Sequence, residues 1–202
     1  MPRVALDGFT SVPPGRVATI VTSLEMTSPP SIKAQALKPA AAELVRVDHP
    51  GTDWYRRLFR TVGEDWLWFS RLRMGRDELA AVIHDPAIHV YVLRVDSCEA
   101  GLLELDFREI GQCEIAFFGL VPNEIGKGLG AYLMREAITR AWNAPIQRLW
   151  MHTCTLDHPS ALAFYRREGF RPYRQQVEIA ADPRVNGELP RSAGAHVPIF
   201  DR

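Results

Sequence analysis

Three strand-like runs follow one another between residues 87 and 121, and they constrain the fold more than any other feature. They read AIHVYVLRV, GLLELDF and CEIAFFGLV, with a period of two in their apolar residues. The segments between them, DSCEA and REIGQ, are too short to hold a helix. Because such short connections join antiparallel neighbours, the region is predicted to be an antiparallel meander.

Helical patterns lie on both sides of this meander. From Asp53 to His84 apolar residues recur at helical spacing, and the pattern stops before Pro86. After the meander come a helix (GAYLMREAITRAW), a strand (RLWMHTCTL), a short helix (HPSALAFYRREGF) that Gly169 ends, and a last strand (VEIA). An early run, RVATIVTSLEM, is predicted to be a strand because it is β-branched and short. The order predicts an α/β fold with a mixed sheet.

Composition limits the class of protein. The chain has 202 residues, of which 47% are hydrophobic and 24% charged, as expected for one globular domain. The 24 basic and 24 acidic residues balance, which argues against a nucleic-acid partner. Cys98, Cys113 and Cys154 have no framework spacing, which indicates reduced thiols in a cytoplasm. No apolar run is long enough to span a membrane and the N-terminus has no secretory pattern, so no membrane association is predicted.

Alternating glycines, Gly126, Gly128 and Gly130, stand between the last meander strand and the helix after it. Such a junction directs unpaired N–H groups and the positive end of the helix dipole at one point, which favours a phosphate. The P-loop pattern is absent. The dinucleotide pattern is matched through Ala131, but the stretch IQRLWMHTCT, about twenty positions further on, offers no acidic residue before Asp157 to hold a ribose. A glycine turn required only by packing is the other alternative.

The stretch EIGKGLGAYLM resembles the acyl-CoA pyrophosphate loop of the GNAT superfamily of N-acetyltransferases, Gln/Arg-x-x-Gly-x-Gly/Ala. The stretch HPSALAFYRREGF resembles its second signature, Asn-x-x-Ala-x-x-x-Tyr-x-x-x-Gly-Phe, and the two blocks follow in the order and spacing of the family. In register, Ile125 stands at the Gln/Arg position and His158 at the Asn position. The resemblance implies an acetyl-CoA site with no metal, formed by Leu120, Val121, Ile125, Gly126, Lys127, Gly128, Leu129, Gly130, Ala131 and His158.

The resemblance also implies a GNAT-like, mostly antiparallel twisted sheet with flanking helices in a single acetyltransferase domain, 1–202. Its predicted parts are an N-terminal arm with a strand (1–45), acceptor-side helices (53–86), an acetyl-CoA-binding core (88–177) and a C-terminal tail (178–202).

Two residues are predicted to be catalytic. Glu114 lies on the strand that leads into the loop and resembles the catalytic glutamate of histone-type members, so it is expected to take the proton of the amine. Glu104 and Asp106 share one face of the neighbouring strand and remain alternative bases. Tyr165 matches the family tyrosine that protonates the leaving sulfur.

A backbone N–H near Leu120 and Val121 is expected to stabilise the oxyanion, because the family strand splays there and Gly119 would permit the distortion. The aromatic run DWLWF lies in the segment that forms the acceptor wall in the superfamily. Beside Glu64 and Asp65 it offers a site for an ammonium group, although ordinary packing explains it equally well.

The stretch HTCTLDH places His152 and Cys154 on one strand face. Two such residues supply only half of a tetrahedral metal site, and they lie too far apart for a direct hydrogen bond between a nucleophile and its base. His152 is therefore expected to contact the acceptor, and no metal site is predicted.

Together these features predict an N-acetyltransferase that moves the acetyl group of acetyl-CoA to a primary amine of a small-molecule or peptide acceptor. Direct transfer in a ternary complex is expected. A non-catalytic acyl-CoA-binding module and, less favoured, a dinucleotide-dependent oxidoreductase remain alternatives. The sequence does not identify the acceptor, and a homodimer is compatible with it.

Overall fold

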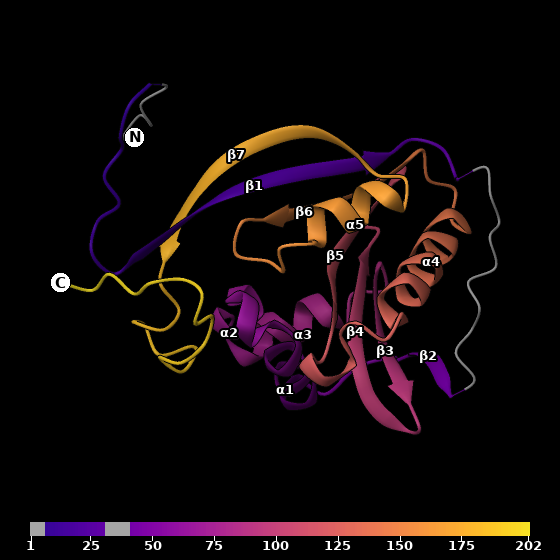
Figure 1. Cartoon of the computed structure of the whole chain (residues 1–202). Coiled ribbons are helices and arrows are strands. Elements are labelled where there is room, and N and C mark those ends of the chain that lie inside the picture. Colours follow the sequence, from indigo (N-terminus) through magenta and orange to yellow (C-terminus); the bar gives the residue numbers. More distant parts are fainter. Residues whose placement is uncertain (1–6, 31–40) are drawn as a thin grey trace.

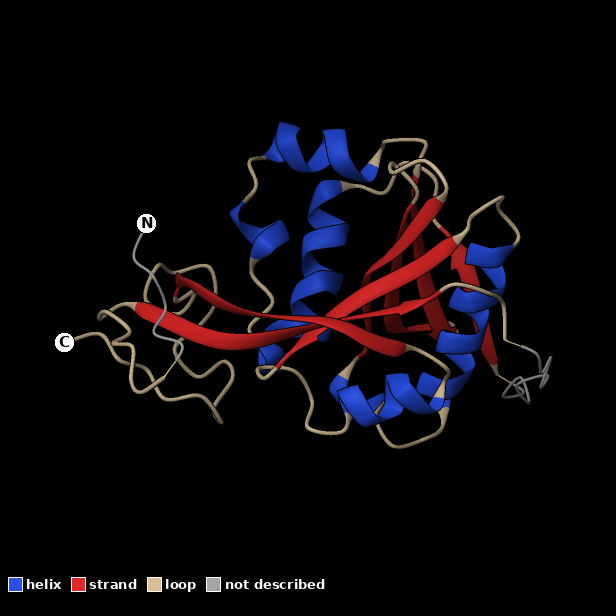
Figure 2. Ribbon diagram, turned by 90° about the horizontal axis from the view of Figure 1, so that it is seen from above, coloured by secondary structure: helices blue, strands red, loops and turns tan. Residues whose placement is uncertain are grey.

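The computed structural model describes residues 7–30 and 41–202, and the remaining parts of the predicted N-terminal arm lie outside this range. Within it the chain forms one seven-stranded sheet in the order β2-β3-β4-β5-β6-β1-β7. Helices cover both faces of this sheet (Figures 1 and 2). The predicted α/β fold with a mixed, mostly antiparallel sheet is confirmed.

The meander occupies the middle of the sheet, as predicted. Its strands are β3 (Ile88–Val95), β4 (Cys98–Asp106) and β5 (Gln112–Leu120), each antiparallel to the next. Sequence analysis missed β2 (Ala42–Arg46), a short strand that pairs antiparallel with β3 at one edge of the sheet.

A parallel pair of strands follows the meander. The helix α4 (Leu129–Trp142) carries the chain from β5 to β6 (Arg148–Cys154). The two strands pair only from Gln112 to Glu114 on β5. Beyond this point they separate, so the sheet opens between them directly before the glycine turn.

The remaining strands extend the sheet beyond β6. The predicted early strand is confirmed as β1 (Arg16–Met26), and it lies between β6 and β7 (Arg171–Ala181), antiparallel to both. The last strand is longer than the predicted VEIA segment. Figure 1 shows β1 and β7 crossing the molecule together as a long ribbon that ends beside the C-terminal segment.

The helices form two layers, and each layer has its own buried core. The layer before the meander contains α1 (Thr52–Gly63), the 3-10 turn η1 (Glu64–Trp66), α2 (Ser70–Arg73) and α3 (Arg76–Ile83). The other layer contains α4 and α5 (Ala161–Arg167), and a further 3-10 turn, η2 (Pro122–Glu124), follows β5. In the first layer Leu58, Phe59 and Val62 pack with Val92 and Leu102 of the sheet. The other layer buries α4 against alternate sheet residues, among them Leu103, Leu105, Leu149 and Met151.

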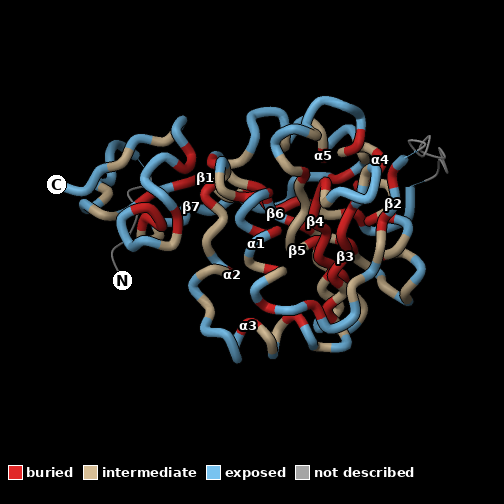
Figure 3. The backbone as a smooth tube through the Cα atoms, turned by 90° about the horizontal axis from the view of Figure 1, so that it is seen from below, coloured by how far each residue is buried: buried red, intermediate tan, exposed pale blue. Residues whose placement is uncertain are grey.

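A third, smaller core lies under the C-terminal segment. Val17, Leu67, Leu156, Leu189 and Ala193 form it, at the end of β1 and β7 that is remote from the main cores (Figure 3). The nearby Arg184 side chain is buried, pairs with Asp182 at 2.7 Å, and donates to several backbone carbonyls of the segment. The predicted tail is thus packed against the domain.

Candidate active site

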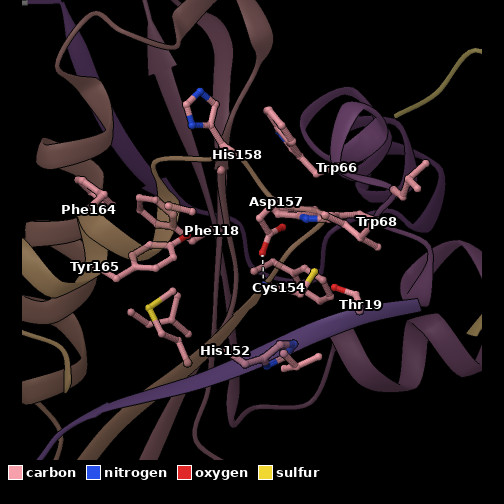
Figure 4. Close-up of a pocket in the computed structure, with 18 of the residues that line it drawn as sticks. Thr19, Trp66, Trp68, Phe118, His152, Cys154, Asp157, His158, Phe164 and Tyr165 are labelled. Carbon is pink, nitrogen blue, oxygen red and sulfur yellow. Dashed lines mark hydrogen bonds between the residues drawn. The ribbon is translucent and has the colours of Figure 1, made fainter. Parts of the chain in front are cut away.

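A cavity of about 480 Å³ lies where β5 and β6 separate. Because the opening passes through the sheet, residues from both helix layers line the cavity. Figure 4 shows Phe164 and Tyr165 on one side of it and Trp66, Trp68 and Thr19 on the other, with His152 near β1.

The α5 side of the cavity carries the predicted acid. Tyr165 is only 8% exposed and packs against the rings of Phe118 and Phe164, with centroids 6.1 and 5.4 Å away. This burial raises the pKa of the Tyr165 hydroxyl far above its usual value. The group therefore stays protonated at neutral pH and has a proton to donate.

The glycine turn borders the same cavity. Gly126 and Gly128 have φ angles of 84° and 83°, and no atom lies within 4 Å of a β-carbon built on either residue. Gly128 is the N-cap of α4, so the first N–H groups of a 14-residue helix have no partner within it. Ile125, Gly126 and Gly130 line the cavity. These main-chain donors and the helix dipole fit a diphosphate group.

The other loop residues that were predicted to bind the coenzyme differ in which of their groups are accessible. The ammonium group of Lys127 is exposed and lies 3.0 Å from Glu124. Leu129 is buried in the core below α4, so only its main chain is available. Ala131 lies in the first turn of α4, where its N–H is one of the free donors.

At Leu120 and Val121 the strand β5 has already separated from β6, and the N–H groups of these two residues differ in availability. The N–H of Val121 donates to the carbonyl of Ala100 at 2.9 Å, so it is not available to an oxyanion. The pairing of β4 with β5 is irregular at Ala116 instead of Gly119. Because N–H directions alternate along a strand, the N–H of Leu120 faces the opening toward β6, where no ladder partner exists.

Gly119 has a packing role. A β-carbon there would lie 2.5 Å from Cγ1 of Val62 and 3.2 Å from the Trp68 ring, so glycine permits α1 to lie against β5. Gly130 also lies close to the strand, with Leu120 Cδ1 at 3.9 Å from its hypothetical β-carbon.

The three candidate bases occupy different environments. Glu104 is fully buried and receives hydrogen bonds from Tyr55 and Arg71, so it belongs to the core below α1 and does not line the cavity. Asp106 is paired with Arg108 at 2.6 Å. Both alternative bases are thus bound in ion pairs away from Tyr165.

Glu114 lies next to the cavity without lining it. Its Oε1 is 3.4 Å from Nδ1 of His152, and the His152 ring lines the cavity. On its other side Glu114 borders a second, polar hollow of about 400 Å³ formed with Asp106, Arg108, Glu109, Gln112 and Trp150. The predicted base therefore reaches the cavity through His152.

The aromatic run forms one wall of the cavity, as the acceptor-wall prediction requires. Trp66, Leu67, Trp68 and Phe69 all line it. Leu67 has a positive φ of 55° and is also buried in the third core. Glu64 and Asp65 do not line the cavity.

Polar residues of β6 and of the turn after it complete the cavity. The Asp157 carboxylate accepts hydrogen bonds from Thr153 and from the N–H of Cys154, which fixes the turn before α5. The Nδ1 atom of His158 accepts from the N–H of Ser160, and its ring packs on Trp66 at 5.3 Å. Burial raises the pKa of the Cys154 thiol.

Residues of β1 and β7 also line the cavity, and sequence analysis missed them. Thr19 and Val21 come from β1, and Glu178 and Ala180 from β7. Their contribution depends on the insertion of β1 between β6 and β7, which no local pattern reveals.

Among the residues that the structure describes, no group of three or more metal-ligating side chains occurs. No helix in the described part of the chain has the length and apolar character needed to cross a membrane.

Solved structures with a similar fold come from several bacteria. A GCN5-related N-acetyltransferase from Sphaerobacter thermophilus matches with a TM-score of 0.59 at 12% identity, over 84% of this chain and 52% of that one. One from Kribbella flavida has a TM-score of 0.52 at 17% identity, over 84% and 60%. This chain therefore spans less than two thirds of either protein. An aminoglycoside acetyltransferase from an uncultured soil sample, solved with trehalose, has a TM-score of 0.53 at 14% identity, over 64% and 88%.

Sequence comparison gives the family directly. No curated protein sequence matches the chain significantly. The model of the Acetyltransferase (GNAT) family matches residues 51–170, more than half of the chain, and this range contains the α1–α3 layer, the meander, the glycine turn and α5. The chain belongs to the GNAT family of acetyltransferases.

Proposed function

We propose that this protein transfers the acetyl group of acetyl-CoA to a primary amine by direct transfer in a ternary complex. The observation that carries the proposal is one continuous cavity through the sheet, which joins the glycine turn and Tyr165 to the aromatic wall on the opposite face. Direct transfer requires both substrates in one enclosed site, with the amine held against the thioester carbonyl.

The residues have separate roles in this proposal. The main chain from Gly126 to Ala131 binds the diphosphate of the coenzyme, and the N–H of Leu120 donates to the developing oxyanion. Tyr165 donates its proton to the leaving sulfur. Glu114 is the carboxylate that stabilises the proton removed from the amine.

The acceptor is proposed to be a small-molecule or peptide amine with an apolar or aromatic body. Trp66, Trp68 and Phe69 offer ring faces that attract an ammonium group. Glu178 adds a carboxylate at the same side of the cavity. A cytoplasmic location is proposed because Cys98, Cys113 and Cys154 are all free thiols.

An amine library assayed for release of free thiol from acetyl-CoA tests the proposal. We expect thiol release and acetylated amine in equal amounts for at least one amine, identified by mass spectrometry. Thermal unfolding measured with acetyl-CoA, CoA and NAD serves as the binding control, because a ligand of the folded state raises Tm by mass action. Stabilisation by CoA compounds without turnover of any amine would favour a binding module, and stabilisation by NAD alone would favour an oxidoreductase.

A further inference from the structure

His152 and Glu114 form a pair at the point where the sheet opens. Glu114 is in the last residue pair between β5 and β6, opposite Trp150. His152 lies two residues beyond Trp150, so alternation places its side chain on the same face. The Glu114 Oε1 atom is 3.4 Å from the His152 Nδ1 atom.

The two side chains differ in access to the cavity. The His152 side chain is 50% exposed and lines the cavity, whereas the Glu114 side chain is 21% exposed and does not line it. An imidazole whose Nδ1–H faces a carboxylate has its Nε2 lone pair available to accept a proton. An amine held in the cavity therefore meets the imidazole before the carboxylate.

The charges around His152 all stabilise its protonated form. Glu114 faces it from β5, Asp157 from the turn after β6, and Glu178 from β7. The cavity-lining residues of β1 and of the segment from Trp66 to Ser70 carry no charge. The hydrogen bond to Glu114 is the largest of the influences that raise the pKa of His152.

We propose that His152 accepts the proton of the acceptor amine, and that Glu114 is a positioning residue that acts through it. This inference rests on the proposed function and refines the role of its base. It differs from the sequence-based prediction in that His152, and not Glu114, meets the amine.

The acceptor enters as an ammonium ion and gives one proton to Nε2 of His152, which becomes an imidazolium stabilised by Glu114. The amine lone pair forms the N–C bond to the thioester carbonyl, and collapse of the tetrahedral intermediate breaks the C–S bond. Tyr165 protonates the sulfur and is reprotonated by the second N–H proton of the amine. His152 then releases its proton to solvent, to which it is half exposed.

The pH dependence of kcat/KM separates the two roles. The wild-type rate should fall at low pH with a midpoint above the usual histidine pKa, since only neutral imidazole accepts a proton. His152→Gln should remove this decrease, the low-pH limb of the profile, and lower kcat/KM at pH 8 by about 100-fold or more. Glu114→Gln should keep the limb but move its midpoint to lower pH, because the imidazole loses the carboxylate that stabilises its charge.

Two further measurements exclude a purely structural effect. His152→Ala should regain part of its activity when imidazole is added, which a misfolded variant would not do. His89→Gln is the matched control, because His89 lies on β3 and lines neither cavity, and it should keep the wild-type profile. All variants should show the wild-type rise in Tm with acetyl-CoA.

The outcomes distinguish this inference from the proposed function. A His152→Gln enzyme with the wild-type limb and a rate within threefold would overturn the role of His152 and leave acetyl transfer in place. Loss of the limb in Glu114→Gln would likewise return the base to Glu114. A wild-type protein that binds acetyl-CoA but acetylates no amine would overturn the proposed function, and the inference with it.

Discussion

Tyr165 and His152 line one cavity from opposite faces of the same sheet. Tyr165 packs in the core with Met151, and His152 is the next residue of β6, so its side chain points to the other face. The arrangement requires the opening between β5 and β6, since a continuous ladder would separate the two groups. In the proposed mechanism, it places the proton donor on the coenzyme side and the proton acceptor on the amine side.

Removing the Tyr165 hydroxyl should slow the chemical step without weakening coenzyme binding. For Tyr165→Phe we expect kcat to fall by about 100-fold or more, because the thiolate would leave unprotonated. The Kd for acetyl-CoA, measured calorimetrically, should stay within twofold. Tyr132→Phe is the control, since Tyr132 is also buried in the core below α4 but does not line the cavity. Equal kcat in the two variants would remove Tyr165 from the mechanism.

A side chain at Gly128 should impair coenzyme binding. In Gly128→Ala the β-carbon is forced onto a φ of 83°, which costs about 1–2 kcal/mol, and the turn that presents the N–H donors is disturbed. We expect the Kd for CoA to rise by about tenfold or more. Gly111→Ala carries a similar strain at φ 75° in a hairpin away from the cavity and should leave the Kd unchanged. Equal losses of affinity in both variants would show that global destabilisation is the cause.

The C-terminal segment should control the acceptor side of the cavity through Leu67. A β-carbon on Gly194 would lie 2.6 Å from Cδ2 of Leu67, the residue between the two cavity-lining tryptophans. For Gly194→Ala we expect KM for the amine to rise several-fold while the Kd for acetyl-CoA stays constant. Gly187→Ala, in the same segment, has a φ of 85° and no atom within 4 Å, so its KM should not change. An unchanged KM in Gly194→Ala would mean that the position of the aromatic side chains in the cavity wall does not depend on the C-terminal segment.

Glu104 should matter for stability and not as a base. It accepts hydrogen bonds from Tyr55 and Arg71 in the core, and Glu104→Gln leaves the buried guanidinium without its counter-ion. We expect the free energy of unfolding in urea to fall by about 3 kcal/mol. Glu136→Gln, which breaks a helical pair with Arg140 in which each side chain is 33% exposed, should cost only about 0.5 kcal/mol. Loss of the low-pH rate limb in Glu104→Gln would instead return this residue to the list of bases.

Local patterns in the sequence predicted the elements that depend on near neighbours. The meander follows from period-two runs joined by short turns, and the helix after Gly128 follows from its apolar stripe. The resemblance to the family placed Tyr165 and the glycine turn beside one ligand, and both border the same cavity.

Features that depend on long-range pairing could not be predicted. The insertion of β1 between β6 and β7 joins segments more than 100 residues apart, and it alone brings Thr19 and Glu178 to the cavity. The Glu114–His152 contact requires the register of a parallel pair, which a one-residue slip would abolish. For the C-terminal tail the sequence predicted only its residue range. The hydrogen bonds of Arg184 to its backbone carbonyls depend on the folded path of the segment, so its packing could not be predicted.

A crystal structure of the protein with CoA bound tests the central claim most directly. The account predicts the diphosphate within hydrogen-bond distance of the main-chain N–H groups from Gly126 to Ala131, and the thiol sulfur near the Tyr165 hydroxyl between β5 and β6. A diphosphate bound elsewhere, or a sulfur directed away from Tyr165, would contradict it.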